Sequence, residues 1–61
     1  MNGISDFNTT YSIAYLASSY DGENYVIMQL EDGSYAFQKN PNHFLKIGMT
    51  DIVGNKILEE I

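Results

Sequence analysis

Cysteine, arginine and tryptophan are absent from this chain of 61 residues, and histidine and proline occur once each. Without cysteine no disulfide can brace the fold, and a single histidine leaves too few ligands for a thiolate or imidazole zinc site. A core this small seldom stabilises a domain by more than ~3–5 kcal/mol without such a brace. We therefore expect self-association, with a homodimer as the default state, and no metal or cofactor.

Positive charge is also scarce, since three lysines face eight acidic residues and the net charge is -5. Arginine supplies most bidentate recognition of phosphates and bases, and an acidic chain is repelled by nucleic acid. We expect no direct binding of nucleic acid. An acidic chain instead suits basic protein surfaces, with an attraction that weakens in salt. The same charge also serves to keep a small protein soluble.

Long apolar runs are missing too, and none approaches the ~20 residues that a membrane span needs. The first residues, Met1 to Asp6, contain no basic start for a signal peptide. We expect a complete short gene product, one domain over residues 1–61, with a cytoplasmic location and no membrane contact.

The clearest local pattern is Tyr25–Glu31, then Asp32-Gly33, then Ser34–Gln38. Asp-Gly between apolar-rich runs predicts a β-hairpin with a two-residue turn, because both turn residues need positive φ. This register pairs Leu30 with Tyr35. It places one apolar set on one face of the ribbon: Val26, Met28, Leu30, Tyr35 and Phe37.

A second Asp-Gly pair, Asp21-Gly22, predicts the same kind of turn upstream. Pairing across it puts the apolar side chains of Tyr11–Ala17 on the face chosen by the first hairpin. Agreement between two turns favours a three-stranded antiparallel meander over residues 11–38, preceded by a polar leader over residues 1–10.

The C-terminal residues 50–61 are predicted to form a helix, with Thr50 as its cap and Asp51 in its first turn. Val53, Ile57 and Ile61 then form an apolar stripe at helical spacing. Gly54 lies within that stripe. Either another backbone approaches closely there, as in a dimer, or Gly54 only weakens the helix. The predicted fold class is α+β, with this helix on one face of the meander.

The segment between the meander and this helix allows two interpretations. Asn40-Pro41 can be a cap followed by proline at the first helical position, which starts a short turn. Alternatively, residues 43–47 form a fourth short strand. The run is too short for periodicity to decide between them.

Catalytic and metal-binding motifs do not emerge from the remaining polar residues. His43 is the single histidine, and no serine lies in a nucleophile-elbow context. Asp21, Glu23 and Asn24 lack the spacing of a calcium loop and are ordinary turn residues. We therefore expect no enzyme activity.

Tyrosine occurs five times, and it is favoured at interfaces because of its large area and polar tip. In the predicted meander Leu16 lies opposite Ile27 on the outer face, so that face is a partner surface unless Phe7, Phe44 and Leu45 cover it. The candidate partner or dimer interface comprises Leu16, Tyr20, Tyr25, Ile27, Glu31, Asp32, Gly54 and Leu58.

As a whole the chain resembles the small acidic phage-encoded proteins that bind and block one host protein, often as homodimers. The resemblance is one of class and assigns no residue. It implies a non-enzymatic inhibitor of the anti-defence or host-takeover type, with a host protein as partner. The alternatives are a structural component that self-assembles, and a small-ligand sponge with a pocket at a dimer interface.

Overall fold

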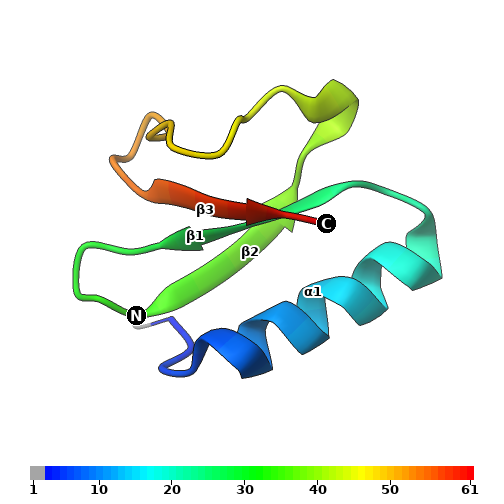
Figure 1. Cartoon of the computed structure of the whole chain (residues 1–61), viewed down its shortest axis with the longest axis horizontal. Coiled ribbons are helices and arrows are strands. Elements are labelled where there is room, and N and C mark those ends of the chain that lie inside the picture. The colour runs from blue at the N-terminus through cyan, green and yellow to red at the C-terminus, as the bar shows by residue number, and fades with distance from the viewer. Residues whose placement is uncertain (1–2) are drawn as a thin grey trace.

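A computed structural model describes residues 3–61 and contains one helix and three strands (Figure 1). The elements are α1 (Phe7–Asp21), β1 (Tyr25–Gln29), β2 (Tyr35–Lys39), a 3-10 turn (Pro41–His43) and β3 (Lys56–Glu60). The strands form one antiparallel sheet in the order β2-β1-β3. The α+β class and the three-stranded antiparallel sheet are confirmed. The predicted position of the helix is wrong, because it is N-terminal.

Helix α1 has a well-defined cap at each end. Asp6 accepts a hydrogen bond from the Thr9 N–H at 2.8 Å, which satisfies one of the free N–H groups of the first turn. Gly22 ends the helix at a φ of 72°, and its N–H donates to the Ser18 carbonyl at 2.8 Å. The helix buries Thr10 and Ala14, which are four residues apart and therefore lie on one face. Phe7 and Ala17 pack beside them.

The predicted first strand, 11–17, and the turn at Asp21-Gly22 are therefore wrong. A positive φ at Gly22 serves a helix C-cap as well as a hairpin turn, so the Asp-Gly pair does not distinguish between them. The meander over 11–38 is replaced by a helix followed by a hairpin. The polar leader also ends early, since residues 7–10 are helical and Ile4 pairs with Tyr35 at the outer edge of β2.

The β1–β2 hairpin is confirmed, but its register differs by one residue from the prediction. Ile27 lies opposite Phe37, and the connection is longer than two residues. The Leu30 N–H donates to the Ser34 carbonyl at 2.8 Å, and Gly33 has a φ of 89°. These features define a three-residue loop whose glycine forms a bulge. Because side chains alternate along a strand, the shift puts Tyr25 and Ile27, in place of the predicted Val26 and Met28, on the face of Phe37.

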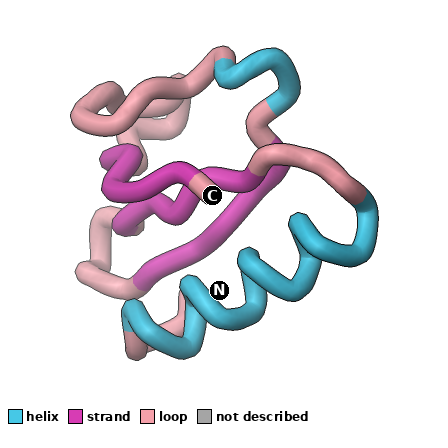
Figure 2. The backbone as a smooth tube through the Cα atoms, turned by 45° about the vertical axis from the view of Figure 1, so that its right-hand side comes forward, coloured by secondary structure: helices cyan, strands magenta, loops and turns pink. Residues whose placement is uncertain are grey.

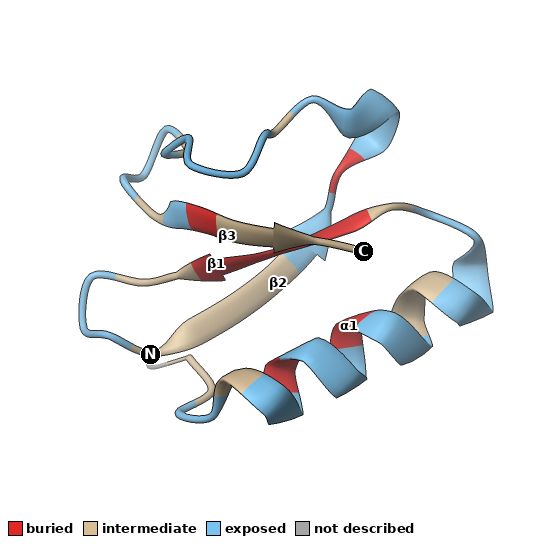
Figure 3. Ribbon diagram, viewed as in Figure 1, coloured by how far each residue is buried: buried red, intermediate tan, exposed pale blue. Residues whose placement is uncertain are grey.

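Strand β1 is buried on both faces (Figure 3). Tyr25 and Ile27 pack against Ala14 of α1. Val26 and Met28 face the other way and pack with Ile57 of β3. A further apolar set completes the two clusters: Phe7, Ala17, Phe37 and Ile61 on the helix side, Ala36 and Leu45 on the other.

The predicted helix over 50–61 is wrong, because Lys56–Glu60 is strand β3 and pairs with the second edge of β1. Pairing satisfies the backbone groups of that edge, which would otherwise stay open. Asp51 does not cap a helix: its carboxylate accepts from the N–H groups of Val53 and Asn55 at 2.9 and 2.8 Å and fixes a turn. Gly54 sits in that turn at a φ of 99°.

Residues 40–55, here called the connecting segment, run along the side of the sheet away from α1 (Figure 2). Leu45 anchors this segment to the cluster around Met28. Asn40-Pro41 begins only a single 3-10 turn, which Asn42 interrupts at a φ of 57°. Residues 43–47 form no strand, so that alternative is wrong.

We predict that Gly54→Ala lowers the free energy of unfolding by about 1–2 kcal/mol, because an L-residue is strained at positive φ. A Cβ at position 54 would meet no atom of the described residues within 4 Å, so the cost comes from the backbone alone. The chain is short enough for chemical synthesis, and D-alanine at position 54 is the matched control. Chemical denaturation should show normal stability with D-alanine. Equal losses with both residues would contradict the backbone explanation.

Candidate functional site

Two turns of the same kind lie in the chain. The first closes the β1–β2 hairpin, and the second precedes β3 and is closed by an isolated bridge between Thr50 and Lys56. In the second, the Asp51 N–H donates to the Asn55 carbonyl at 2.9 Å and the Gly54 N–H donates to the Asp51 carbonyl at 3.0 Å. The first turn makes the equivalent bonds between Leu30, Gly33 and Ser34. The first presents Glu31-Asp32 at its tip, called here the acidic tip. The second presents Ile52-Val53, called here the apolar tip.

The apolar tip is unusual for a turn, where polar residues and glycine dominate. Ile52 is fully exposed, and Val53 is 78% exposed. Asp51 holds this tip in place, and the donated Asn55 N–H keeps the pKa of its carboxyl below the ordinary value. The carboxylate therefore stays charged at neutral pH, and the two aliphatic side chains are displayed on a braced turn.

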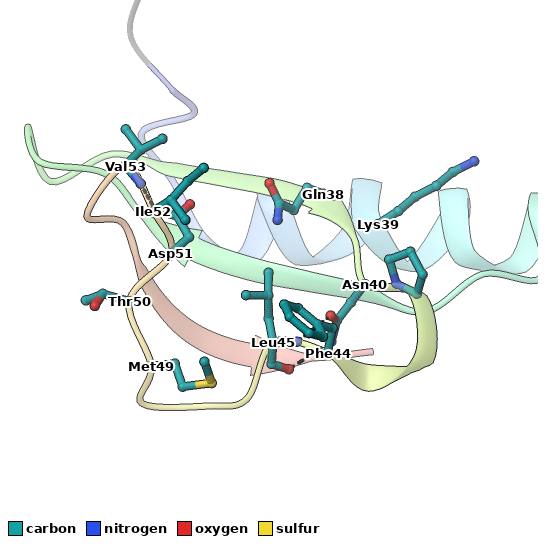
Figure 4. Close-up of a pocket in the computed structure, with 11 residues that line it drawn as sticks. Gln38, Lys39, Asn40, Phe44, Leu45, Met49, Thr50, Asp51, Ile52 and Val53 are labelled. Carbon is teal, nitrogen blue, oxygen red and sulfur yellow. Dashed lines mark hydrogen bonds between the residues drawn. The ribbon is translucent and has the colours of Figure 1, made fainter.

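A hollow of about 460 Å³ lies between the apolar tip, the 3-10 turn and the end of β2 (Figure 4). Its lining is mostly apolar, and Gln38 contributes to its polar side. Lys39 lies at its edge, but the Lys39 side chain points away from the hollow and toward Asp21 (Figure 4). Phe44 is 78% exposed at its rim. We call this hollow the apolar groove, and its apolar lining consists of Pro41, Phe44, Leu45, Met49, Ile52 and Val53.

Asn40 fixes the floor of the groove. Its side chain is fully buried and holds the Leu45 backbone on both sides, accepting from the N–H at 2.7 Å and donating to the carbonyl at 2.9 Å. The same amide donates to the Glu60 carboxylate at 2.8 Å. One buried side chain therefore ties the connecting segment to β3.

His43 reinforces this connection from the surface. Its Nδ1 lies 2.8 Å from a Glu60 carboxylate oxygen, and its Nε2 lies 3.2 Å from the Asn24 amide nitrogen. A carboxylate only accepts, so Nδ1 carries the proton and Nε2 is free to accept from Asn24. The bond from His43, with a second from Asn40, holds the pKa of Glu60 below its ordinary value of 4.5.

The acidic tip lies beside the apolar tip. A shallow hollow connects them, with Leu30, Glu31 and Asp32 on one side and Val53 and Asn55 on the other. The Ser34 side chain and N–H donate to Asp32, and these bonds lower the pKa of its carboxyl. Negative charge therefore stands next to the exposed aliphatic pair at neutral pH.

A polar cluster at the end of α1 joins the helix to the sheet. The Tyr25 hydroxyl donates to Asp21, whose carboxylate also lies 3.7 Å from the Lys39 ammonium. This bond lowers the pKa of Asp21 and raises that of Tyr25 to about 12. Tyr25 therefore keeps its proton, and the cluster serves to anchor the helix end.

The helix presents a second apolar surface on the side away from the sheet. Leu16 is 66% exposed and Tyr20 is 94% exposed. A shallow hollow lies between Tyr11, Tyr15 and Leu16. We call this surface the outer face of α1, and its large exposed side chains are Tyr11, Ile13, Tyr15, Leu16 and Tyr20.

The structure distributes the predicted interface residues over separate places. Leu16 and Tyr20 lie on the outer face of α1, and Glu31 and Asp32 form the acidic tip. Leu58 is half-buried in β3.

Three of the predicted interface residues require correction. Tyr25 and Ile27 are buried beneath α1, so the prediction that they lie on an exposed sheet face is wrong. The physical reason is that β1 is covered on both faces, by α1 on one and by the cluster around Ile57 and Leu45 on the other, so neither face of this strand is free. Gly54 lies in a turn, so it cannot permit close packing of a C-terminal helix.

The groove residues Phe44, Met49, Ile52 and Val53 were not predicted as a site. Val53 falls in the predicted helical stripe, and Phe44, Met49 and Ile52 belong to no sequence pattern that predicts a binding site. The signal that identifies the tip is Asp51 followed by Gly54 three residues later. An Asx side chain bonding the next N–H groups and a glycine at positive φ are typical of a turn.

Comparisons with models of protein families, with curated proteins and with solved structures find no match for this chain. Within residues 3–61, no three histidine, aspartate or glutamate side chains gather closely enough to hold a metal ion. The one α-helix of this described part lacks the length and apolar character needed to cross a membrane. The site must therefore be interpreted from its own geometry.

We predict that Asn40→Ala lowers the free energy of unfolding by about 2–3 kcal/mol, since it leaves buried partners of the Leu45 backbone unpaired. Asn8→Ala is the matched control, because Asn8 is exposed on α1. It should change stability by less than about 0.5 kcal/mol. Urea denaturation of both variants measures the difference. A small effect at Asn40 would show that water replaces its hydrogen bonds.

We also predict that part of the stability is lost in acid through Glu60. Its folded pKa lies below its ordinary value of 4.5, so its contribution is present above that value and is lost as the pH falls through the folded pKa. Glu60→Gln should flatten the fall of unfolding free energy over this window. Glu59→Gln, its neighbour with no such bond from His43, should leave the pH profile unchanged. An unaltered profile in Glu60→Gln would contradict this role.

Proposed function

We propose that this chain is a non-enzymatic protein-binding module that holds a segment of another protein in the apolar groove. The bound segment carries one or two large apolar side chains next to a lysine or arginine. The observation that carries the proposal is the apolar tip: Ile52 and Val53 are displayed to solvent on a turn that Asp51 braces, at the rim of an apolar hollow.

The apolar part of the proposal follows from exposure and rigidity. Exposed aliphatic and aromatic side chains around a hollow mark interaction sites, because they gain free energy when water leaves them. The hollow is held from below by Asn40 and at its rim by the Asp51 turn. A braced site loses little conformational entropy on binding.

The basic part of the proposal follows from the acidic tip. Glu31 and Asp32 share a hollow with Val53, so a segment seated on the apolar tip extends toward two carboxylates. A lysine or arginine at that end finds an opposite charge. The net charge of -5 favours such partners in general and disfavours anionic lipid surfaces.

This function agrees with the resemblance to small acidic phage-encoded inhibitors, which bind a host protein without chemistry. Blocking a host protein would follow if the captured segment belongs to that protein's own working surface. The proposal depends on the groove, and the resemblance contributes no residue to it.

A displayed library of random linear peptides tests the proposal with the whole chain as bait. We predict enrichment of peptides that pair a large apolar residue with lysine or arginine. Ile52→Ser should weaken the affinity for the enriched peptides by about tenfold or more, as expected for a central contact. Ile47→Ser makes the same change on an exposed isoleucine outside the groove lining and should have little effect.

Charge is tested with Asp32→Asn and with salt. Fluorescence anisotropy should show weaker binding of an enriched peptide in Asp32→Asn and at higher ionic strength. Peptides without basic residues, or binding that is equal in the Ile52 and Ile47 variants, would contradict the proposal.

A further inference from the structure

The charges of this chain avoid one element. All eight acidic residues and all three lysines lie outside residues 7–20. Helix α1 is therefore uncharged except for Asp21 at its end, although most of its surface is exposed (Figure 3). Exposed helix faces of small proteins usually carry lysine and glutamate, which maintain solubility and pair along the helix.

Large side chains occupy this uncharged surface. The helix buries Thr10 and Ala14 against the sheet, while its outer face presents Tyr15, Leu16 and Tyr20 to solvent. Apart from Phe7, which packs against the sheet, the larger apolar side chains of α1 thus point outward and the smaller ones inward. This is the reverse of what burial in a monomer favours, and it is the arrangement expected of a helix that is covered on both sides.

We infer that the outer face of α1 is the interface of a symmetric homodimer. Two copies of this chain carry the same net charge of -5, so they repel each other over most of their surfaces. A self-interface must avoid burying acidic groups against acidic groups. The outer face of α1 meets this requirement, and its tyrosines supply large contact area with a polar tip.

A basic partner suits this face poorly. Its lysines and arginines would be desolvated against tyrosine, serine and leucine, with no carboxylate of α1 between residues 7 and 20 to compensate them. The acids at the helix ends are already engaged: Asp6 with Thr9, and Asp21 with Tyr25 and Lys39. The charge pattern therefore assigns the basic partner to the groove and the second copy to the helix.

Symmetry makes the position of Leu16 informative. A two-fold pair of antiparallel helices brings the same residues together at the axis, and the two helices overlap over their full length when their middles lie against each other. Leu16 is two residues from the middle of Phe7–Asp21, which is about 3 Å along the axis at 1.5 Å per residue. The two Leu16 side chains therefore lie close to the symmetry axis and close to each other.

The dimer leaves the groove free. The connecting segment lies on the side of the sheet away from α1, so two copies joined through α1 keep their grooves on opposite outer sides (Figure 2). Such a dimer presents two binding sites at once. A partner that carries two suitable segments, or that is itself a dimer, would be held more tightly than by one site.

The test is the molar mass of the full chain in solution, measured by sedimentation equilibrium over a range of concentrations. We expect a reversible monomer–dimer equilibrium for the natural chain. Leu16→Lys and Leu16→Glu should each raise the dimer dissociation constant by more than about tenfold. Mixing the two variants should restore dimers, because opposite charges then meet near the axis.

Rescue by mixing distinguishes loss of an interface from loss of folding, and circular dichroism of each variant confirms that the helix is retained. Ile47→Lys places the same charge on an exposed isoleucine outside α1 and should leave the equilibrium unchanged. Dimers that survive both Leu16 variants but dissociate in Ile52→Lys would overturn the inference in favour of the groove. A monomer at every concentration would overturn it outright.

These outcomes are independent of the proposed function. Peptide binding by a monomeric Leu16→Lys variant, with its groove intact, would support the groove even if the helix interface were disproved. A stable dimer without any peptide preference would support the helix interface alone.

Discussion

The burial of β1 on both faces and both edges is the constraint on which this fold depends. Val26 and Ile27, adjacent in sequence, point to opposite faces and are both fully buried. One layer of structure can cover only one face, so a chain with this central strand needs a second cover. Helix α1 supplies one, and Leu45 with the connecting segment supplies the other. Strands β2 and β3 satisfy the two edges.

This constraint also explains why so much apolar surface is exposed. A chain of 61 residues has few residues left once β1 is enclosed, and its covers are thin. Beyond Phe7 at its start, the helix meets the sheet through small side chains and turns its tyrosines outward. The connecting segment meets the sheet mainly through Leu45 and leaves Phe44, Ile52 and Val53 at the surface. Both covers thus have an apolar outer side, and we propose a different partner for each.

The sequence predicts the centre of this fold better than its ends. The hairpin around Asp32-Gly33 is recognisable because its turn residues and flanking strands agree. Asp21-Gly22 carries the same two residues but caps a helix, since both structures need a glycine at positive φ. Residues 50–61 show helical spacing of apolar side chains, yet the open edge of β1 and the Asp51 turn make them a hairpin and a strand. Tertiary contacts decide whether such a segment forms a helix, a turn or a strand, and a local sequence pattern does not contain those contacts.

The candidate site was less predictable for the same reason. Leu16 and Tyr20 are exposed, but on a helix that the alternating pattern of Tyr11–Ala17 concealed. Tyr25 and Ile27 are predicted to be exposed, but they belong to a strand that is covered on both faces. The apolar groove brings together Gln38, Phe44 and Ile52 from parts of the chain that no short motif links. Such a site forms only when the connecting segment has packed on the sheet.

The most direct test of separate partners for the two apolar surfaces is the change in backbone amide chemical shifts along a dilution series of the natural chain. We predict that shifts change along residues 8–20 and stay constant in β1 and in residues 44–53, because in the proposed dimer α1 alone meets the second copy. Changes centred on residues 44–53, or no changes at any concentration, would contradict the assignment of separate partners to the two apolar surfaces.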